Sequence, residues 1–420
     1  MLLNLKPHYA RAWIDLTPGE MLWALGKIID PIKENDGSLK RSFETEFACF
    51  IGTQAAMTFS NCRSALYFSL KALEFNEGDE IILPAFSFWV DTAMVLLAGL
   101  KPVFVDVDFK TMNIDTNKIT QKITSRTRAI IPTHLNGRIA DMHGIMEIAK
   151  KHTLRVIEDC ARACGGFFGG QRAGAFDIGV FSFGYGKSFY GFGGGMVTSN
   201  DGVFIKKLQA IKKNFFQYGR KEKAAKLLKG MVLKFLTNKH AFGWFLFPKT
   251  YDYQLLGEKK YQDWFKYQMP PYNEVPKEFQ TDMFDAQLAL GRKQLKRIDQ
   301  TNEKRIEHAK ILNRELQHIT EIVRPQNSEN GDNVFVHYAI YYQGKDELQK
   351  YLFQNRIDAQ DESAMCVPSF KRFINFALEP YTSAGKLNGK VLFLPTHPNL
   401  TYDDILYVAD RVKQFFRGKK

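Results

Sequence analysis

The strongest constraint on the fold is a series of short apolar runs that alternate with helix-like segments through the first half of the chain. Several runs are apolar at nearly every position and end in a polar residue, as strands do when both faces of a parallel sheet are buried. This alternation indicates an α/β fold, in which helices cover both faces of a mostly parallel sheet. The expected strands are 55–59, 79–84, 102–108, 129–137, 156–159, 178–183 and 196–198.

Three reactive or polar side chains lie at or just beyond the ends of two of these strands. Asp159 closes one run, Ser182 lies at the end of another, and Lys187 follows five residues later, before a run of glycines. Pyridoxal phosphate requires an amine for its aldehyde carbon, an acid beside its ring nitrogen and donors for its phosphate. Lys187, Asp159 and Ser182 would fill these roles in that order. Taken singly, Lys187 also fits a solvated loop lysine, and Asp159 also fits a helix cap.

The order of motifs here resembles that of the DegT/StrS family of pyridoxal-phosphate-dependent sugar aminotransferases. Members carry V-I-E-D-x-A at a strand end, then S-F-x-x-x-K, then a glycine run and a short strand. The segments in this chain are VIEDCA, SFGYGK and GFGGGMVTS, and the resemblance extends from about Phe43 to the C-terminus. It implies fold type I of the aspartate aminotransferase superfamily. We therefore expect a large cofactor-binding domain at 1–275 and a smaller α+β domain at 276–420.

The same resemblance assigns further residues to the cofactor. In the turn that holds the phosphate in the family, Cys62 and Arg63 replace a glycine and a threonine, and Arg63 either contacts the phosphate or points to solvent. Phe88 takes the place of the aromatic residue that stacks on the pyridine ring. Gln280 replaces an asparagine that reaches the phosphate of the other subunit, which implies a homodimer. Arg162 replaces a glutamine, and its guanidinium would favour the phenolate of the cofactor or bind an anionic substrate group.

The reaction implied by the resemblance is amino transfer from an amino acid, glutamate in the family, to a nucleotide-linked keto-sugar for surface glycan biosynthesis. Two alternatives stay open: a non-catalytic sensor or scaffold that binds the same cofactor, and a pyridoxal-dependent sugar dehydratase. Family members with dehydratase chemistry have histidine in place of Lys187, which argues against the second. A further departure is Asp282, which stands where the family has an arginine.

The positive charge of the chain is concentrated in one segment. Of the net charge of +13, residues 206–266 contribute +11, from 15 basic and four acidic residues. The family crosses this region with a shorter connection, so we expect a basic amphipathic insertion at about 206–270. It either packs on the body or a partner subunit, or lies weakly on an anionic membrane surface. The apolar residues expected on one helical face are Leu227, Leu228, Met231, Val232, Phe235 and Leu236, and the aromatic residues that follow are Phe242, Trp244, Phe245 and Phe247.

The remaining features exclude several classes of protein. No recognition fold for nucleic acid accompanies the positive charge, and the five cysteines lack the paired spacing of a metal site. The sequence contains no signal-peptide core and no apolar run of 18 residues. We therefore expect a cytoplasmic enzyme without a bound metal, peripheral at the inner membrane surface if the basic segment binds lipid.

Overall fold

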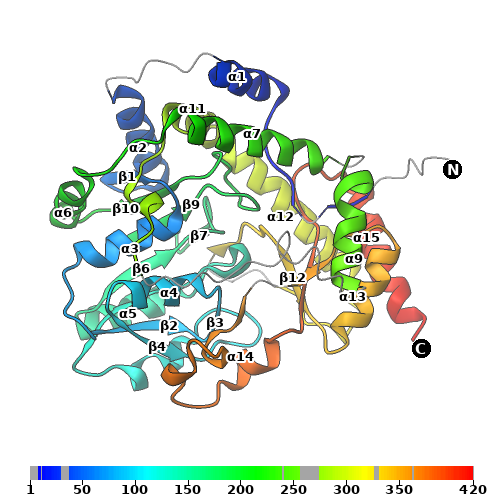
Figure 1. The fold of residues 1–420 in the computed structure, drawn as a ribbon. Helices are drawn as coiled ribbons and strands as arrows, with labels where there is room; N and C mark the ends of the chain where they lie inside the picture. The colour runs from blue at the N-terminus through cyan, green and yellow to red at the C-terminus, as the bar shows by residue number, and fades with distance from the viewer. Residues whose placement is uncertain are drawn as a thin grey trace.

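The centre of the molecule is a seven-stranded sheet in the order β1-β10-β9-β6-β5-β2-β4 (Figure 1). The computed structural model describes residues 8–10, 12–29, 37–238, 241–255, 274–325, 331–361 and 364–419. Neighbouring strands are parallel from β9 to β4, and β10 runs antiparallel to both of its neighbours. The expected mostly parallel sheet is confirmed. Its strands are β1 (Ala55–Phe59), β10 (Gly195–Ser199), β9 (Ile178–Ser182), β6 (Arg155–Asp159), β5 (Thr127–Ile130), β2 (Glu80–Pro84) and β4 (Lys101–Val105).

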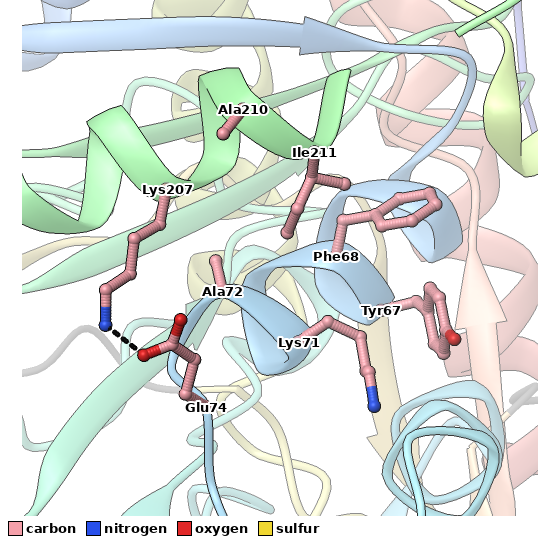
Figure 2. A pocket seen from close by; sticks show the side chains of 8 residues that line it. All are labelled: Tyr67, Phe68, Lys71, Ala72, Glu74, Lys207, Ala210 and Ile211. Atoms are coloured by element: carbon pink, nitrogen blue, oxygen red, sulfur yellow. Dashed lines mark hydrogen bonds and ion pairs between the residues drawn. The ribbon is translucent and has the colours of Figure 1, made fainter. Parts of the chain in front are cut away.

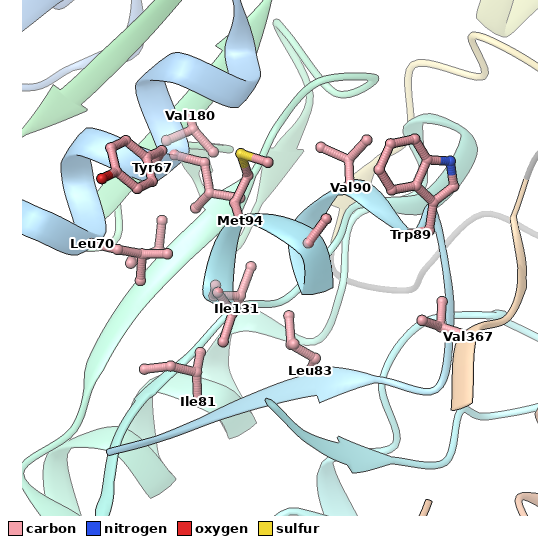
Figure 3. Packing of buried hydrophobic residues seen from close by; sticks show 14 of the residues in the cluster. Tyr67, Leu70, Ile81, Leu83, Trp89, Val90, Met94, Ile131, Val180 and Val367 are labelled. Atoms are coloured by element: carbon pink, nitrogen blue, oxygen red, sulfur yellow. The ribbon is translucent and has the colours of Figure 1, made fainter. Parts of the chain in front are cut away.

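Helices cover both faces of this sheet, as alternate residues of β2 show. Ile81 and Leu83 join the apolar cluster under α3, α4 and α6, whereas Ile82 between them joins the cluster under α2, α5 and α11. In Figure 3 the side chains of Ile81 and Leu83 lie on the side of β2 that faces Met94 of α4. The covering helices are α2 (Ser38–Ile51), α3 (Cys62–Ala72), α4 (Val90–Leu97), α5 (Met142–His152), α6 (Gly202–Lys212) and α11 (Asp285–Leu295).

A second, smaller sheet forms the C-terminal part of the fold. Its strands β12 (Tyr338–Tyr341), β15 (Val391–Leu394) and β13 (Gln360–Asp361) are antiparallel, and residues of α12 (Ile298–Glu315), α13 (Lys345–Gln354) and α15 (Tyr402–Arg417) form a cluster with them. The chain at 364–388 returns to the large sheet, where β14 (Met365–Cys366) pairs with β3 (Phe86–Ser87) and α14 (Thr382–Leu387) joins the cluster of β2. The domain boundary at 275/276 stays a prediction.

The N-terminal segment and the basic segment pack against each other, next to the helix α11 that covers the large sheet. Ile14 and Leu16 share a cluster with Leu227 and Met231 of α7 (Arg220–Leu236) and with residues of α11. Beyond α7 come a π-helix, η4 (Phe242–Leu246), and α9 (Phe247–Leu255), which packs against Phe353 of α13. The helix α1 (Pro18–Ile29) lies beside α7 (Figure 1). Residues 239–240 and 256–270 of the expected insertion lie outside the described residues.

Short elements complete the fold. Among the described residues, no helix is both long enough and apolar enough to cross a membrane. A small sheet pairs β11 (Gly331–Asp332), β7 (Phe167–Phe168) and β8 (Gln171–Arg172). The 3₁₀ turns are Thr116–Lys118, Thr120–Lys122, Leu135–Gly137, Lys277–Gln280, Val367–Ser369 and Ile374–Phe376.

Candidate active site

The candidate site lies where β6 and β9 end side by side. The two strands are parallel, and Asp159, the last residue of β6, pairs with Val180 of β9, so that Ser182 at the end of β9 lies at the same edge of the sheet. The carboxyl ends of parallel strands are the usual place for a ligand in such a fold. The loop after Ser182 carries Lys187, which is half-buried. The predicted acid and the predicted amine therefore lie in one neighbourhood, in which each affects the other electrostatically.

Lys187 is a cation without a fixed partner. Within the described residues, no hydrogen bond or ion pair holds its Nζ atom. Desolvation, and then the neighbouring guanidinium of Arg162, lower the pKa of the Lys187 amine to about 8, against the opposing effect of Asp159. An amine with a pKa near the working pH can hold and release a proton, which is what a catalytic base requires.

Asp159 is buried and fixed by its backbone. Its Oδ1 accepts a hydrogen bond of 2.9 Å from the amide of Ala161, its own amide donates to Pro132, and its carbonyl accepts from His134. The predicted acid is therefore held at a defined place at the end of β6. Sequence reasoning missed the second carboxyl group beside it, Asp91 in the first turn of α4, which lies within hydrogen-bonding reach of Asp159.

The first turn of α3 lies at the same edge of the sheet. Asn61 caps this helix by accepting a hydrogen bond from the Ser64 amide, and a helix N-terminus favours an anion such as a phosphate. Cys62 is close enough to Asp159, Asp91 and Lys187 for their charges to affect it, and burial raises the pKa of its thiol well above the usual value. Cys62 is thus a neutral group of the site.

Gln280 lies near the same turn of its own chain. The hydroxyl of Ser64 donates to the carbonyl of Phe279 at 2.8 Å, and Gln280 follows as the last residue of a 3₁₀ turn, where its carbonyl accepts from the amide of Phe216. Arg63 lowers the pKa of Glu278, after larger effects of Lys226, so its charge also lies close to this turn. The structure therefore brings Cys62, Arg63 and Gln280 to one region.

Arg162 reaches the site from the loop after β6. Its Nη1 donates to Oδ1 of Asn136 at 2.6 Å, and its guanidinium carbon lies 5.6 Å from the centre of the Phe393 ring. The pKa of Lys187 falls in part because this guanidinium is close. Phe88 is half-buried beside Trp89, and the stacking role predicted for it stays a prediction.

The charge reversal at Asp282 has a local explanation. Its Oδ2 lies 2.9 Å from Nζ of Lys212 and 2.5 Å from Nζ of Lys40, and both Asp282 and Lys212 are almost fully buried. These three residues form an ion network in which Asp282 and Lys212 are buried and Lys40 is partly exposed. The carboxylate thus balances two lysines of this chain, which an arginine at position 282 would repel.

Two other groups of residues lie outside this site. Among the described residues, His134, Glu158 and Cys160 are the group whose ligand atoms lie within 4.8 Å of one another. However, Glu158 already accepts from His134 and from the amides of Gly174 and Phe176, so the cluster is a satisfied hydrogen-bond network. A pocket between α3 and α6 (Figure 2) is lined by Tyr67, Phe68, Lys71, Ala72, Glu74, Lys207, Ala210 and Ile211, none of which belongs to the Lys187 cluster.

The residues present fit pyridoxal phosphate. A half-buried amine without a partner in the described part of the chain, a fixed carboxyl group and a helix N-terminus surround one edge of the sheet, as the cofactor's aldehyde, ring nitrogen and phosphate require. In addition, the buried hydroxyl of Ser188, next to Lys187, forms no hydrogen bond with a described residue. Buried polar atoms of this kind normally have a partner, and a ligand is one way to supply it.

The comparison with known proteins agrees with this class of site. The model of the DegT/DnrJ/EryC1/StrS aminotransferase family matches residues 25–242 and 249–413. The chain belongs to this family, and its fold is the one shared by pyridoxal-phosphate-dependent aminotransferases. An aminotransferase structure from Psychrobacter cryohalolentis superposes with a TM-score of 0.78 at 26% identity, covering 98% of this chain and 99% of that one.

Two curated relatives carry more specific names. The UDP-N-acetyl-3-dehydro-alpha-D-glucosamine 3-aminotransferase of Acidithiobacillus ferrooxidans is 41% identical over 213 residues, which are 50% of this chain and 56% of that protein. The GDP-perosamine synthase of Caulobacter vibrioides is 39% identical over 172 residues, which are 40% of this chain and 46% of that protein. Both matches span about half the length of the relative.

Proposed function

We propose that this protein is an aminotransferase that uses pyridoxal phosphate to move an amino group from glutamate to a nucleotide-linked keto-sugar. The observation that carries the proposal is Lys187, an amine without a fixed partner that lies beside Asp159 at the strand ends. Relatives named for UDP-linked and GDP-linked amino sugars support the choice of acceptor class. The product would be an amino sugar for a surface glycan.

The roles of the residues follow from their places. Bound pyridoxal phosphate supplies a conjugated ring that takes up an electron pair from the carbon next to the transferred nitrogen. Lys187 would bind the cofactor at rest. Once the donor's amino group has displaced it, the free Lys187 amine would accept the proton from the donor's carbon and later deliver a proton to the carbon that bears the amino group of the product. The carboxylate of Asp159 keeps a proton on the ring nitrogen. Ser182 and the first turn of α3 bind the phosphate, with Cys62 and Arg63 in that turn.

Two side chains orient the partners of the reaction. Phe88 stacks on the ring, and Arg162 either stabilises the phenolate of the cofactor or binds an anionic group of a substrate. The Asn136 carboxamide, 2.6 Å from the Arg162 guanidinium, fixes the direction of that charge. Because its guanidinium lowers the pKa of Lys187, Arg162 also keeps part of the amine neutral at neutral pH.

A coupled assay tests the reaction. The purified protein, pyridoxal phosphate and glutamate are incubated with a panel of UDP-, GDP- and dTDP-linked keto-sugars, and 2-oxoglutarate is measured. We expect 2-oxoglutarate beyond one equivalent per active site to form only with a keto-sugar present, in a one-to-one ratio to the amino sugar. A cofactor spectrum that does not change on adding glutamate, with no amino sugar from any acceptor, would favour the sensor. Loss of a sugar hydroxyl without amino transfer would favour the dehydratase.

The active unit is proposed to be a two-fold dimer in which Gln280 reaches the phosphate of the other chain. Gln280 is half-buried, and Phe216, whose amide binds its carbonyl, is 51% exposed, so an apolar ring lies at the surface beside it. Mixing inactive Gln280→Ala chains with inactive Lys187→Ala chains tests this. Heterodimers should regain activity, because both defects then fall in one of the two sites. No recovery in demonstrated heterodimers would contradict the shared site.

The basic segment is proposed to bind weakly to an anionic membrane surface. One face of α7 is buried through Leu227 and Met231, but Leu228, Val232 and Phe235 on the adjoining face are each about half exposed. Phe235 lies 6.2 Å from Phe245 of η4, so this apolar stripe continues into the aromatic region. Phe242 and Phe247, by contrast, are buried.

The exposed stripe lies in a segment with a net charge of +11. Lysines near an anionic surface each contribute on the order of 1 kcal/mol of binding free energy. This contribution favours the inner face of the cell membrane as the surface that the stripe contacts. Flotation with vesicles rich in phosphatidylserine, at low and high salt, tests it. Changing Leu228, Val232 and Phe235 to Ser should abolish binding, whereas the exposed control pair Ile374→Ser and Leu378→Ser should not. If the stripe variant instead changes the oligomeric state, the stripe is a subunit contact.

A further inference from the structure

Asp91 is a second carboxyl group next to Asp159, and no sequence motif identifies it. Asp91 lies in the first turn of α4, three residues after Phe88, and is only 4% exposed. Its neighbours Val90 and Met94 pack into the cluster over the large sheet (Figure 3), which fixes the position of the turn. Asp91 is therefore held in place by its helix, independently of any ligand.

A hydrogen-bond chain sets the orientation of the Asp91 carboxyl group. The hydroxyl of Thr133 donates to Oδ2 of Asp91 at 3.0 Å, and the hydroxyl of Ser87 lies 3.0 Å from that of Thr133. Thr133 also pairs with Asp159 in a bridge that extends the ladder of β5 and β6. With Oδ2 bound to Thr133, the other oxygen of Asp91 is available for the hydrogen bond with Asp159.

Two adjoining carboxyl groups in an enclosed site do not both ionise, because the repulsion between their charges is poorly screened. Burial, and then the charge of Asp159, raise the pKa of Asp91 well above its usual range, despite the opposing hydrogen bond from Thr133. The charge of Lys187 also lowers the pKa of Asp91, and Asp91 in turn contributes, after burial and Asp159, to the raised pKa of the Cys62 thiol. Asp159 accepts a hydrogen bond from the backbone amide of Ala161.

We propose that Asp91 is a positioning residue that stays a neutral carboxylic acid and donates a hydrogen bond to Asp159, so that Asp159 remains ionised and aimed at the cofactor's ring nitrogen. The proposal rests on the proposed function for the role of Asp159, but the protonation of Asp91 belongs to the protein alone. The competing explanation is that Asp91 is an ionised residue that stabilises the N-terminus of α4, as acidic residues in a first turn do.

Infrared spectroscopy of the cofactor-free protein separates the two explanations. A neutral carboxylic acid has a carbonyl-stretch band that an ionised carboxylate lacks. We expect such a band in the parent at neutral pH, and we expect Asp91→Asn to remove it. The matched control is Asp106→Asn, which alters another buried carboxyl group that accepts backbone amides, from Ser383 and Ala384, and should leave the band unchanged. A parent without the band, or a band that survives Asp91→Asn, overturns the proposal. Neither result depends on whether the protein transfers amino groups.

The functional part is tested with the cofactor bound. Asp91→Ala should lower kcat about tenfold to 100-fold, as expected for a lost hydrogen bond to a charged group. It should also shift the pH at which the bound cofactor's absorbance changes. Asp91→Asn should recover most of both effects, because an amide can donate the same hydrogen bond. If Asn is as defective as Ala in folded protein, as judged by circular dichroism and melting temperature, Asp91 does not act as a donor and the proposal fails.

Discussion

Lys187, in the loop after β9, and Lys212, the last residue of α6, both have desolvated amines, but their surroundings differ. Nζ of Lys212 is 2.9 Å from Asp282, donates to the carbonyl of Thr58 and lies 4.5 Å from the centre of the Phe59 ring. Nζ of Lys187 has no such partner among the described residues. Desolvation lowers the pKa of both amines, but at Lys212 the charge of Asp282 opposes it most, whereas at Lys187 the guanidinium of Arg162 adds to it.

The difference shows how one fold separates a structural lysine from a reactive one. A buried cation with a carboxylate in contact is fixed, and it stays charged because its partner is charged. A desolvated amine that faces carboxyl groups without contacting one remains mobile and can lose its proton. The positions of the carboxyl groups therefore separate the two lysines. Asp282 forms an ion pair with Lys212, whereas Asp159 and Asp91 interact with each other beside Lys187.

The largest expected effect follows from removing the charge of Asp159. Asp159→Asn should lower turnover about 100-fold or more, about 2.7 kcal/mol of barrier, because an amide cannot keep a proton on the ring nitrogen. Cofactor content per chain should change little, since Lys187 and the phosphate ligands remain. Steady-state kinetics and absorbance measure the two quantities. A loss of less than about tenfold would show that Asp159 is not the partner of the ring nitrogen.

Loss of the ion pair at Lys212 should lower the stability of the protein and leave its reaction unchanged. Asp282→Asn leaves Lys212 and Lys40 facing each other without a carboxylate, and should lower the free energy of unfolding by about 3–5 kcal/mol. Adding Lys212→Met should recover much of that loss, because the buried unpaired cation is gone. Urea unfolding of the parent, the single and the double variant measures both. Equal stability of all three proteins would contradict the ion network.

The smallest expected effect is a shift in the reactivity of Lys187. In cofactor-free protein, labelling of this amine by a lysine reagent should rise with pH to a midpoint near pH 8, because its pKa is lowered to about 8. Arg162→Gln removes a neighbouring positive charge, so the pKa and the midpoint should rise. Labelling resolved by peptide mass measures both residues in one sample, with Lys212 as the slow internal control. A midpoint unchanged by Arg162→Gln would contradict the contribution of the guanidinium.

The sheet and the meeting of Asp159 with Lys187 were predictable because both depend on local patterns. Apolar runs identify the strands, and parallel strands necessarily end at one edge, so residues far apart in sequence converge there. Asp91 could not be found this way. An acidic residue in the first turn of a helix is common, and its approach to Asp159 depends on how α4 packs against α3, β2 and β4.

The basic segment shows a second limit of sequence reasoning. The sequence pattern correctly predicted a helix with a wide apolar face at α7. It did not predict that this face divides into a buried half and an exposed half. The buried half is covered by Ile14 and Leu16, which lie some 200 residues earlier in the chain. The sequence likewise offers no explanation for the acidic residue at position 282, which the ion pairs of Asp282 with Lys212 and Lys40 supply. In both cases the missing information was a long-range contact.

The most direct test of the central claim is to find which lysine binds the cofactor. The protein is incubated with pyridoxal phosphate, reduced with borohydride and digested, and the labelled peptide is identified by mass. We predict stoichiometric label on Lys187 and none on Lys212, although both amines are desolvated. Label on Lys212 or on any other lysine in place of Lys187 would contradict the account.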